Sequence, residues 1–197
     1  VLFRSTAYEK APKRLKYWFN ENSFIDLQRL KQSIEAVVTE NDYKDAFLCL
    51  FSSILKASSK WLTKSIKPQI DPNKEEIVIW DVFKRHFDKF SKALIQINSC
   101  ALKPSNIRIE NESFLDFEDF PKVDLIISSP PYVTSYEYAD LHQLSSLWLQ
   151  YASDYRDLRK GSIGSMYNSE GFEIDLNSLN AVGQQIVQKF VDRKSVV

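Results

Sequence analysis

The sequence predicts an α/β fold, namely part of a Rossmann-like domain that is preceded by a helical N-terminal portion. Two observations predict this fold. Apolar residues recur at helical spacing through most of the first 100 positions, and a short apolar run from Val123 to Ile127 stops abruptly at Pro130 and Pro131. A third observation indicates that the Rossmann-like domain is only partial. The four glycines all follow that run, whereas a complete domain of this class normally needs a glycine-rich turn after its first strand.

Three amphipathic helices are expected in the N-terminal portion. The first spans about 23–39, with Ser23 as its N-cap, and the third spans 78–98, with a basic side on which His86 reads as a surface histidine. The second begins at Asn41 and is apolar around most of its girth, so we expect it to be buried against the sheet. The apolar positions are Phe24, Leu27, Leu30, Ile34, Val37 and Val38 in the first helix, Phe47, Leu50, Phe51, Ile54 and Leu55 in the second, and Val82, Phe83, Phe87, Phe90, Leu94 and Ile97 in the third.

Two further N-terminal features have alternative interpretations. The aromatic run at 17–19 is either a platform near a nucleic-acid base or, as we prefer, part of the core. The stretch 64–76 contains two prolines and many charges, which indicates a loop. Its neighbouring lysines, which are Lys60, Lys64, Lys67 and Lys74, either contact DNA or, as we prefer, face solvent.

Two strands are expected in the second half of the chain. Asn106 to Glu110 reads as a short strand, and the β-branched run at 123–127 reads as a buried parallel strand. Proline has no N–H to donate to a sheet, so the second strand must end before Pro130. Ser128 and Ser129 then lie at its carboxyl end, which is the edge where open α/β sheets bind ligands.

Helices and a basic turn follow the corner that Ser129-Pro130-Pro131-Tyr132 forms after this strand. A helix is expected from about 136 to 151, capped by Thr134 or Ser135. Arg156, Arg159 and Lys160 then precede a Gly/Ser stretch at 161–165, which either holds a DNA phosphate or acts as a flexible lid. A last amphipathic helix is expected over 175–191.

Charge balance, cysteine content and the lack of a long apolar stretch indicate which classes of protein are compatible with this composition. The 26 Lys and Arg residues equal the 26 Asp and Glu residues, so net charge gives no support for nucleic-acid binding and any basic surface must be local. Cys49 and Cys100 read as buried thiols in a reducing compartment, not as a disulfide or a metal site. The absence of a long apolar stretch and of a signal peptide predicts a soluble, cytoplasmic protein.

The Ser-Pro-Pro-Tyr corner suits a specific chemistry. The Ser129 hydroxyl and the Pro130 carbonyl, held by fixed φ angles, offer two acceptors side by side. An exocyclic amine carries two N–H donors that match this pair, and Tyr132 supplies a flat face on which a base can stack. An amine held in this way keeps its lone pair for attack on an electrophile and can lose its proton during or after attack.

The sequence Ser129-Pro130-Pro131-Tyr132 after an apolar strand resembles the catalytic motif of S-adenosyl-L-methionine-dependent amino-methyltransferases that act on DNA. Those enzymes carry Asp, Asn or Ser, then Pro-Pro, then an aromatic residue. The serine form with a preceding serine is typical of the cytosine-N4 enzymes, although some adenine-N6 enzymes use it. The resemblance implies S-adenosyl-L-methionine as methyl donor, double-stranded DNA with a flipped target base as partner, and catalytic roles for these four residues.

The resemblance also implies roles outside the motif. Glu112 takes the place of the aspartate that lies beside the cofactor, although its side chain is longer and a turn or helix-capping role is the alternative; Ser128 is the second cofactor candidate. Tyr138 or His142 is expected to face the target base. Arg159 and Lys160 are the candidates for contact with DNA, and no metal is expected.

The glycine-rich loop that grips the methionine part of the cofactor in these enzymes has no counterpart, because the sequence contains no Gly-x-Gly. We therefore expect an internal fragment of a longer protein that is inactive by itself. Its regions are an atypical N-terminal end (1–16), a mainly helical region (17–100), an α/β catalytic segment (101–165), and a C-terminal helix with a truncated end (166–197). The alternatives are an adenine-N6 methyltransferase of DNA, a methyltransferase of RNA bases, and a helical interaction module without catalysis.

Overall fold

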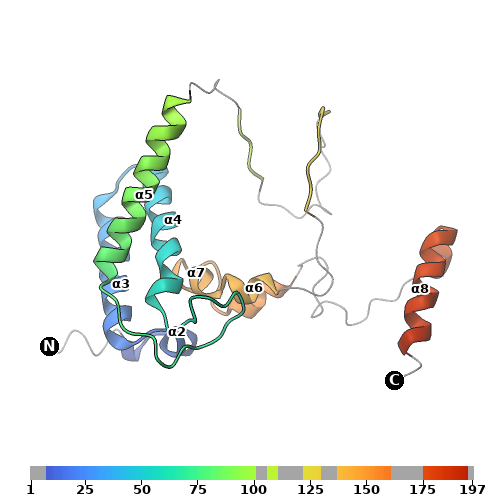
Figure 1. Cartoon of the computed structure of the whole chain (residues 1–197), viewed down its shortest axis with the longest axis horizontal. Coiled ribbons are helices and arrows are strands. Elements are labelled where there is room, and N and C mark those ends of the chain that lie inside the picture. The colour runs from blue at the N-terminus through green and yellow to red at the C-terminus, as the bar shows by residue number, and fades with distance from the viewer. Residues whose placement is uncertain (1–7, 101–105, 111–121, 130–136, 161–174, 195–197) are drawn as a thin grey trace.

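A computed structural model describes residues 8–100, 106–110, 122–129, 137–160 and 175–194. Helices α3, α4 and α5 lie side by side, and α2, α6 and α7 lie at one end of them (Figure 1). The elements in order are α2 (Lys13–Trp18), α3 (Glu21–Val37), α4 (Asn41–Ser58), α5 (Ile79–Ser99), α6 (Tyr138–Leu141), α7 (Gln143–Trp148), the 3₁₀ helices η1 (Tyr155–Arg159) and η3 (Leu176–Ser178), and α8 (Ala181–Lys194).

The turn between α2 and α3 buries two aromatic side chains. Trp18 is 1% exposed and Phe19 is 0% exposed, which confirms core packing for these two, whereas Tyr17 is 48% exposed. The backbone is extended at Phe19 and Asn20, so α3 begins at Glu21. Ser23 was therefore wrongly expected to cap this helix; it is buried within the first turn of α3.

Helix α4 begins at Asn41, as expected, and packs against other helices. Its buried side contacts α3, α5 and α7. Phe47 stacks on Phe83 and Phe87 of α5, with ring centroids 6.4 and 5.8 Å apart. The expectation that α4 covers a sheet is wrong, because helices occupy its apolar sides throughout the described part of the chain.

Trp148 of α7 packs against aromatic rings from three other parts of the core. Its ring lies 5.7 Å from Phe19, 4.9 Å from Phe24 and 5.6 Å from Phe51, measured between centroids. These rings come from the α2–α3 turn, α3 and α4. The segment 138–160 is consequently part of the same hydrophobic core as the N-terminal helices.

The connection between α4 and α5 is a loop, as expected, and it is tied to the core. Trp61 and Ile70 form an isolated antiparallel bridge. The Lys74 ammonium donates to the carbonyls of Lys56 and Trp61 at 3.0 and 2.8 Å. These two bonds and its partial burial show that Lys74 supports the loop and does not simply face solvent, and the burial also lowers the pKa of its ammonium group.

The predicted α/β fold is wrong for the residues that the structure describes. Neither 106–110 nor 122–129 forms a strand, and Ile109 and Ile127 are each 87% exposed. A strand exists through hydrogen bonds to a neighbouring strand, and no described residue pairs with either segment. A β-branched composition favours a strand but does not supply the partner that a strand needs.

The cysteine prediction needs correction as well. Cys49 and Cys100 are both free, but both are exposed. Cys49 lies two positions from the buried Phe51 and therefore points to the opposite side of α4, and Cys100 follows the last turn of α5. Within the described ranges, no helix is long and apolar enough to cross a membrane, and no group of three His, Cys, Asp or Glu residues could hold a metal ion.

Candidate functional site

Ser129 is the one residue of the Ser-Pro-Pro-Tyr corner that lies within the described part of the chain. Ser128 and Ser129 are exposed, at the end of a segment without regular secondary structure. Pro130, Pro131, Tyr132 and Glu112, all named as site residues from the sequence, lie outside the described residues.

The helix expected after the corner is broken at His142. α6 ends at Leu141 and α7 begins at Gln143, with His142 between them at φ −94° and ψ 5°. The Gln143 amide nitrogen Nε2 donates to the Asp140 carbonyl at 2.6 Å. That carbonyl would accept the fourth following backbone N–H in a continuous helix, so this side chain takes the place of one helical hydrogen bond.

Tyr138 and His142 lie one turn apart at this break. The His142 N–H donates to the Tyr138 carbonyl at 3.0 Å, and both side chains are exposed. Tyr138 is 52% exposed, whereas Leu144 and Trp148 of α7 are buried. Both candidates for facing a base are accessible to a ligand.

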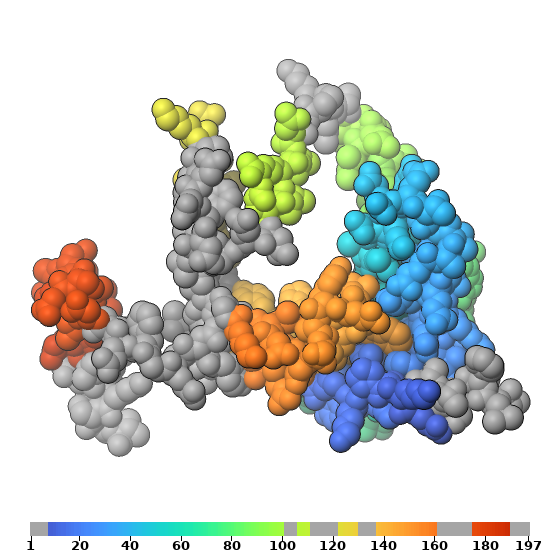
Figure 2. Space-filling model, turned by 180° about the vertical axis from the view of Figure 1, so that it is seen from behind, coloured from blue at the N-terminus to red at the C-terminus, as the bar shows by residue number. Residues whose placement is uncertain are grey.

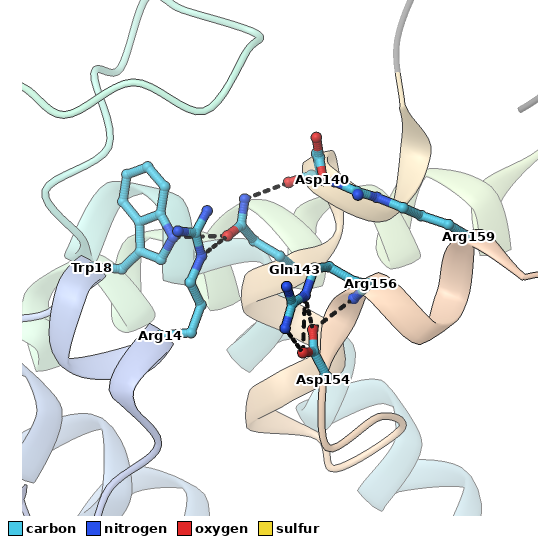
Figure 3. Close-up of polar contacts among 7 residues, drawn as sticks. All are labelled: Arg14, Trp18, Asp140, Gln143, Asp154, Arg156 and Arg159. Carbon is cyan, nitrogen blue, oxygen red and sulfur yellow. Dashed lines mark hydrogen bonds and ion pairs between the residues drawn. The ribbon is translucent and has the colours of Figure 1, made fainter. Parts of the chain in front are cut away.

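Gln143 joins α2 to the segment 138–160 (Figure 3). It is fully buried, and its oxygen Oε1 accepts from Arg14 Nε at 2.7 Å and from Trp18 Nε1 at 2.8 Å. A buried indole N–H without an acceptor costs free energy, and Gln143 supplies the acceptor for Trp18 from a position more than 120 residues away in the chain. A second link comes from Ser145 of α7, whose hydroxyl lies 2.7 Å from that of Ser52 of α4.

The basic residues after α7 are paired with carboxylates. Arg159 contacts Asp140 at 2.6 Å, and both side chains of this pair are largely buried. Lys160 contacts Asp157 at 3.0 Å on the surface. These two cations were expected to contact DNA, and the structure places each of them next to an acidic partner.

Arg156 forms a close ion pair with Asp154 (Figure 3). The Arg156 Nε lies 3.0 and 2.9 Å from the two Asp154 oxygens. The hydrogen bonds from the Arg156 side chain, followed by its backbone N–H, lower the pKa of Asp154 to about 2. The Asp154 carboxylate therefore stays ionised throughout the neutral and mildly acidic range.

The sequence pattern gave no role to Arg14, Gln143 or Tyr155, which the structure brings together. The Arg14 guanidinium lies 5.0 Å from the centroid of the Tyr155 ring, and the Arg159 guanidinium lies 5.7 Å from that same ring. One signal was available in the sequence. Gln143 lies four positions from Ala139 and from Leu147 and so shares a helical face with both, and a polar residue on an apolar face is buried only with hydrogen-bond partners.

Comparison with known proteins finds a similarity to a curated methyltransferase. No protein-family model and no solved structure matches the chain. The chain is similar to the Type II methyltransferase M.MvaI of Kocuria varians, with 28% identity over 160 residues. The match covers 72% of this chain and 34% of that protein, so the chain spans about a third of the length of this relative. A continuous match of that size leaves at most about 55 of the 197 residues outside it and therefore includes positions 128–132.

Proposed function

We propose that this chain is part of a DNA methyltransferase that transfers a methyl group to an exocyclic amine, with cytosine N4 as the preferred target. One observation carries the proposal. The Ser129-Pro130-Pro131-Tyr132 corner falls inside the stretch that is similar to a Type II methyltransferase. The corner adds a chemical reason to this similarity, because its two hydrogen-bond acceptors match the two N–H donors of an exocyclic amine.

In the proposed reaction, the Ser129 hydroxyl oxygen and the Pro130 carbonyl accept the two N–H groups of the target amine. Tyr132 stacks on the flipped base, and Tyr138 or His142 approaches it from the helix break. The nitrogen lone pair would then be free to attack the methyl group that a bound sulfonium donor supplies. The C–S bond of the donor would break as the C–N bond forms, a neutral thioether would leave, and the amine would release one proton to water. Arg159 and Lys160 are proposed to lie beside the DNA backbone, where they would exchange their carboxylate partners for phosphates.

S-adenosyl-L-methionine is proposed as the methyl donor, and Ser128 and Glu112 as its contacts. Ser128 is exposed and so is accessible to a ligand, and Glu112 lies outside the described residues. In this proposal the cofactor would supply the methyl group, and no step is assigned to Ser128 or Glu112 beyond contact with it.

The test is a methylation assay on duplex DNA, with the chain in its full reading frame and labelled S-adenosyl-L-methionine. Ser129→Ala should reduce methylation by about 10²-fold or more, because it removes one of two acceptors that orient the amine. Ser33→Ala on the exposed side of α3 is the matched control and should retain activity. A Ser129→Ala variant that methylates DNA at the wild-type rate would contradict the proposed role of the corner.

The nature of the product separates the remaining candidates. Digestion of the methylated DNA to nucleosides and mass analysis should show N4-methylcytosine. N6-methyladenine in DNA, or methylation of RNA alone, would assign the same chemistry to another amine. A protein that methylates neither nucleic acid would instead favour the helical interaction module.

A further inference from the structure

A cleft of about 480 Å³ lies between α2 and the segment that follows α7. Its walls combine the rings of Tyr17 and Tyr155 with the cations Lys13, Arg14 and Arg156. Figure 2 shows α2 directly against the 138–160 segment on one face of the molecule. The cleft thus depends on the packing of two segments that are far apart in the sequence.

Arg14 is held in this cleft, and no carboxylate of the described residues forms an ion pair with it. Its guanidinium lies 5.0 Å from the Tyr17 and Tyr155 ring centroids and 5.5 Å from that of Trp18. Its Nε donates to Gln143, which is a neutral acceptor. Since the other two guanidinium nitrogens have no hydrogen-bond partner among the described residues, they can form the two parallel bonds that an arginine makes with a phosphate.

The surroundings are locally basic, although the whole chain has no net charge. Residues 8–18 carry four cations, Lys10, Lys13, Arg14 and Lys16, and one carboxylate, Glu9. Asp154 also lines the cleft, but Arg156 binds it closely. The resulting excess of positive charge next to exposed tyrosine surface favours a polyanionic ligand.

We propose that this cleft holds a backbone phosphate of the DNA substrate, with Arg14 forming the paired hydrogen bonds and Lys13 providing a second positive charge. This inference rests on the proposed function, because that function supplies the DNA. It assigns DNA contact to α2, which lies outside the Ser-Pro-Pro-Tyr corner and outside the basic residues at 156–160 that the sequence pattern indicated. The tyrosine rings orient the Arg14 guanidinium before the ligand arrives and so reduce the entropy lost on binding.

The test is binding of a fluorescently labelled DNA duplex, measured by anisotropy at a series of salt concentrations without methyl donor. Lys13→Gln should weaken binding several-fold and reduce the slope of log affinity against log salt by about 1. Arg14→Lys keeps the charge but removes the paired geometry, so it should weaken binding while largely preserving the slope. Lys92→Gln, an equal change of charge at an exposed position on α5, is the matched control and should change neither quantity.

The outcomes separate this inference from the proposed function. Lys13 is exposed, so unchanged binding and slope in Lys13→Gln would overturn the phosphate site even if Ser129→Ala abolishes methylation. A chain that does not bind the duplex would overturn it as well. Inorganic phosphate at constant ionic strength should not displace the duplex at low millimolar concentration, and displacement would indicate a site for a free phosphate and not for a DNA strand. Thermal unfolding of each variant shows whether a loss of binding reflects a loss of folding.

Discussion

Replacement of Gln143 by leucine should destabilise the protein by about 2–3 kcal/mol. Gln143 is fully buried, and its oxygen is the acceptor for the N–H of Trp18, which is itself only 1% exposed. Leucine has a similar size, so little cavity is formed, but the indole N–H is left buried and unsatisfied at a cost of about 1–3 kcal/mol. The lost bond to Arg14 adds less than about 1 kcal/mol, because this partly exposed guanidinium can bind water in its place.

Urea unfolding followed by tryptophan fluorescence measures this effect. The matched control is Gln96→Leu on the exposed side of α5, which should change the free energy of unfolding by less than about 0.5 kcal/mol. Gln143→Glu keeps an acceptor for Trp18 but loses the donor to the Asp140 carbonyl, so it should fall between wild type and Gln143→Leu. A Gln143→Leu variant as stable as the Gln96→Leu control would refute the reasoning, because it would mean that the Trp18 N–H does not depend on Gln143.

Three further predictions concern stability and ionisation. Gln150 has a positive φ of 60° at the end of α7, where the N–H groups of Gln150 and Tyr151 donate to the carbonyls of Leu147 and Ser146 as in a Schellman motif. Gln150→Gly should therefore raise the free energy of unfolding by about 1 kcal/mol in urea melts, because glycine adopts this backbone conformation without strain. A decrease in that free energy would contradict the assignment. The Asp154 pKa of about 2 lies below its ordinary value of 3.8, so the stabilisation from its pair with Arg156 is complete above pH 3.8 and is lost as the pH falls through 2. A carboxyl chemical-shift titration should show this pKa, and Arg156→Gln should return it towards 3.8; an unchanged value would exclude Arg156 as the cause. Phe51→Ala removes a ring that is 0% exposed and should cost about 3–5 kcal/mol in calorimetry or urea unfolding, whereas a loss below 1 kcal/mol would show that the ring is not in the core.

Helix positions could be predicted from the sequence because local periodicity controls them. α4 begins at the expected Asn41, and α5 runs from Ile79 to Ser99 against an expected 78–98. The buried residues Leu50, Phe51 and Ile54 were all named on the apolar side of α4. In these helices each backbone hydrogen bond is made within the segment, so the local sequence contains nearly all the information that is needed.

Strands and helix breaks could not be predicted in the same way, because they depend on residues elsewhere in the chain. The run at 123–127 has the composition of a strand, but no described segment pairs with it. The helix expected across 136–151 breaks at His142, where the Gln143 side chain bonds to the Asp140 carbonyl. Nothing in the periodicity of that helix indicates which carbonyl a glutamine side chain will contact.

The two proposed sites differ in how a loss of function in their variants has to be interpreted. Ser129 is exposed and has no hydrogen-bond partner among the described residues, so Ser129→Ala should remove chemistry without lowering stability. Gln143 contacts Arg14, Trp18 and the Asp140 carbonyl, so Gln143→Leu would disturb the α2 cleft, the helix break and the core together. A loss of methylation in Gln143→Leu therefore supports the DNA-binding cleft only if binding falls at a temperature where the variant is still folded. A Ser129→Ala variant that binds DNA with the wild-type salt slope but does not methylate it would separate the chemistry of the corner from the binding of the strand.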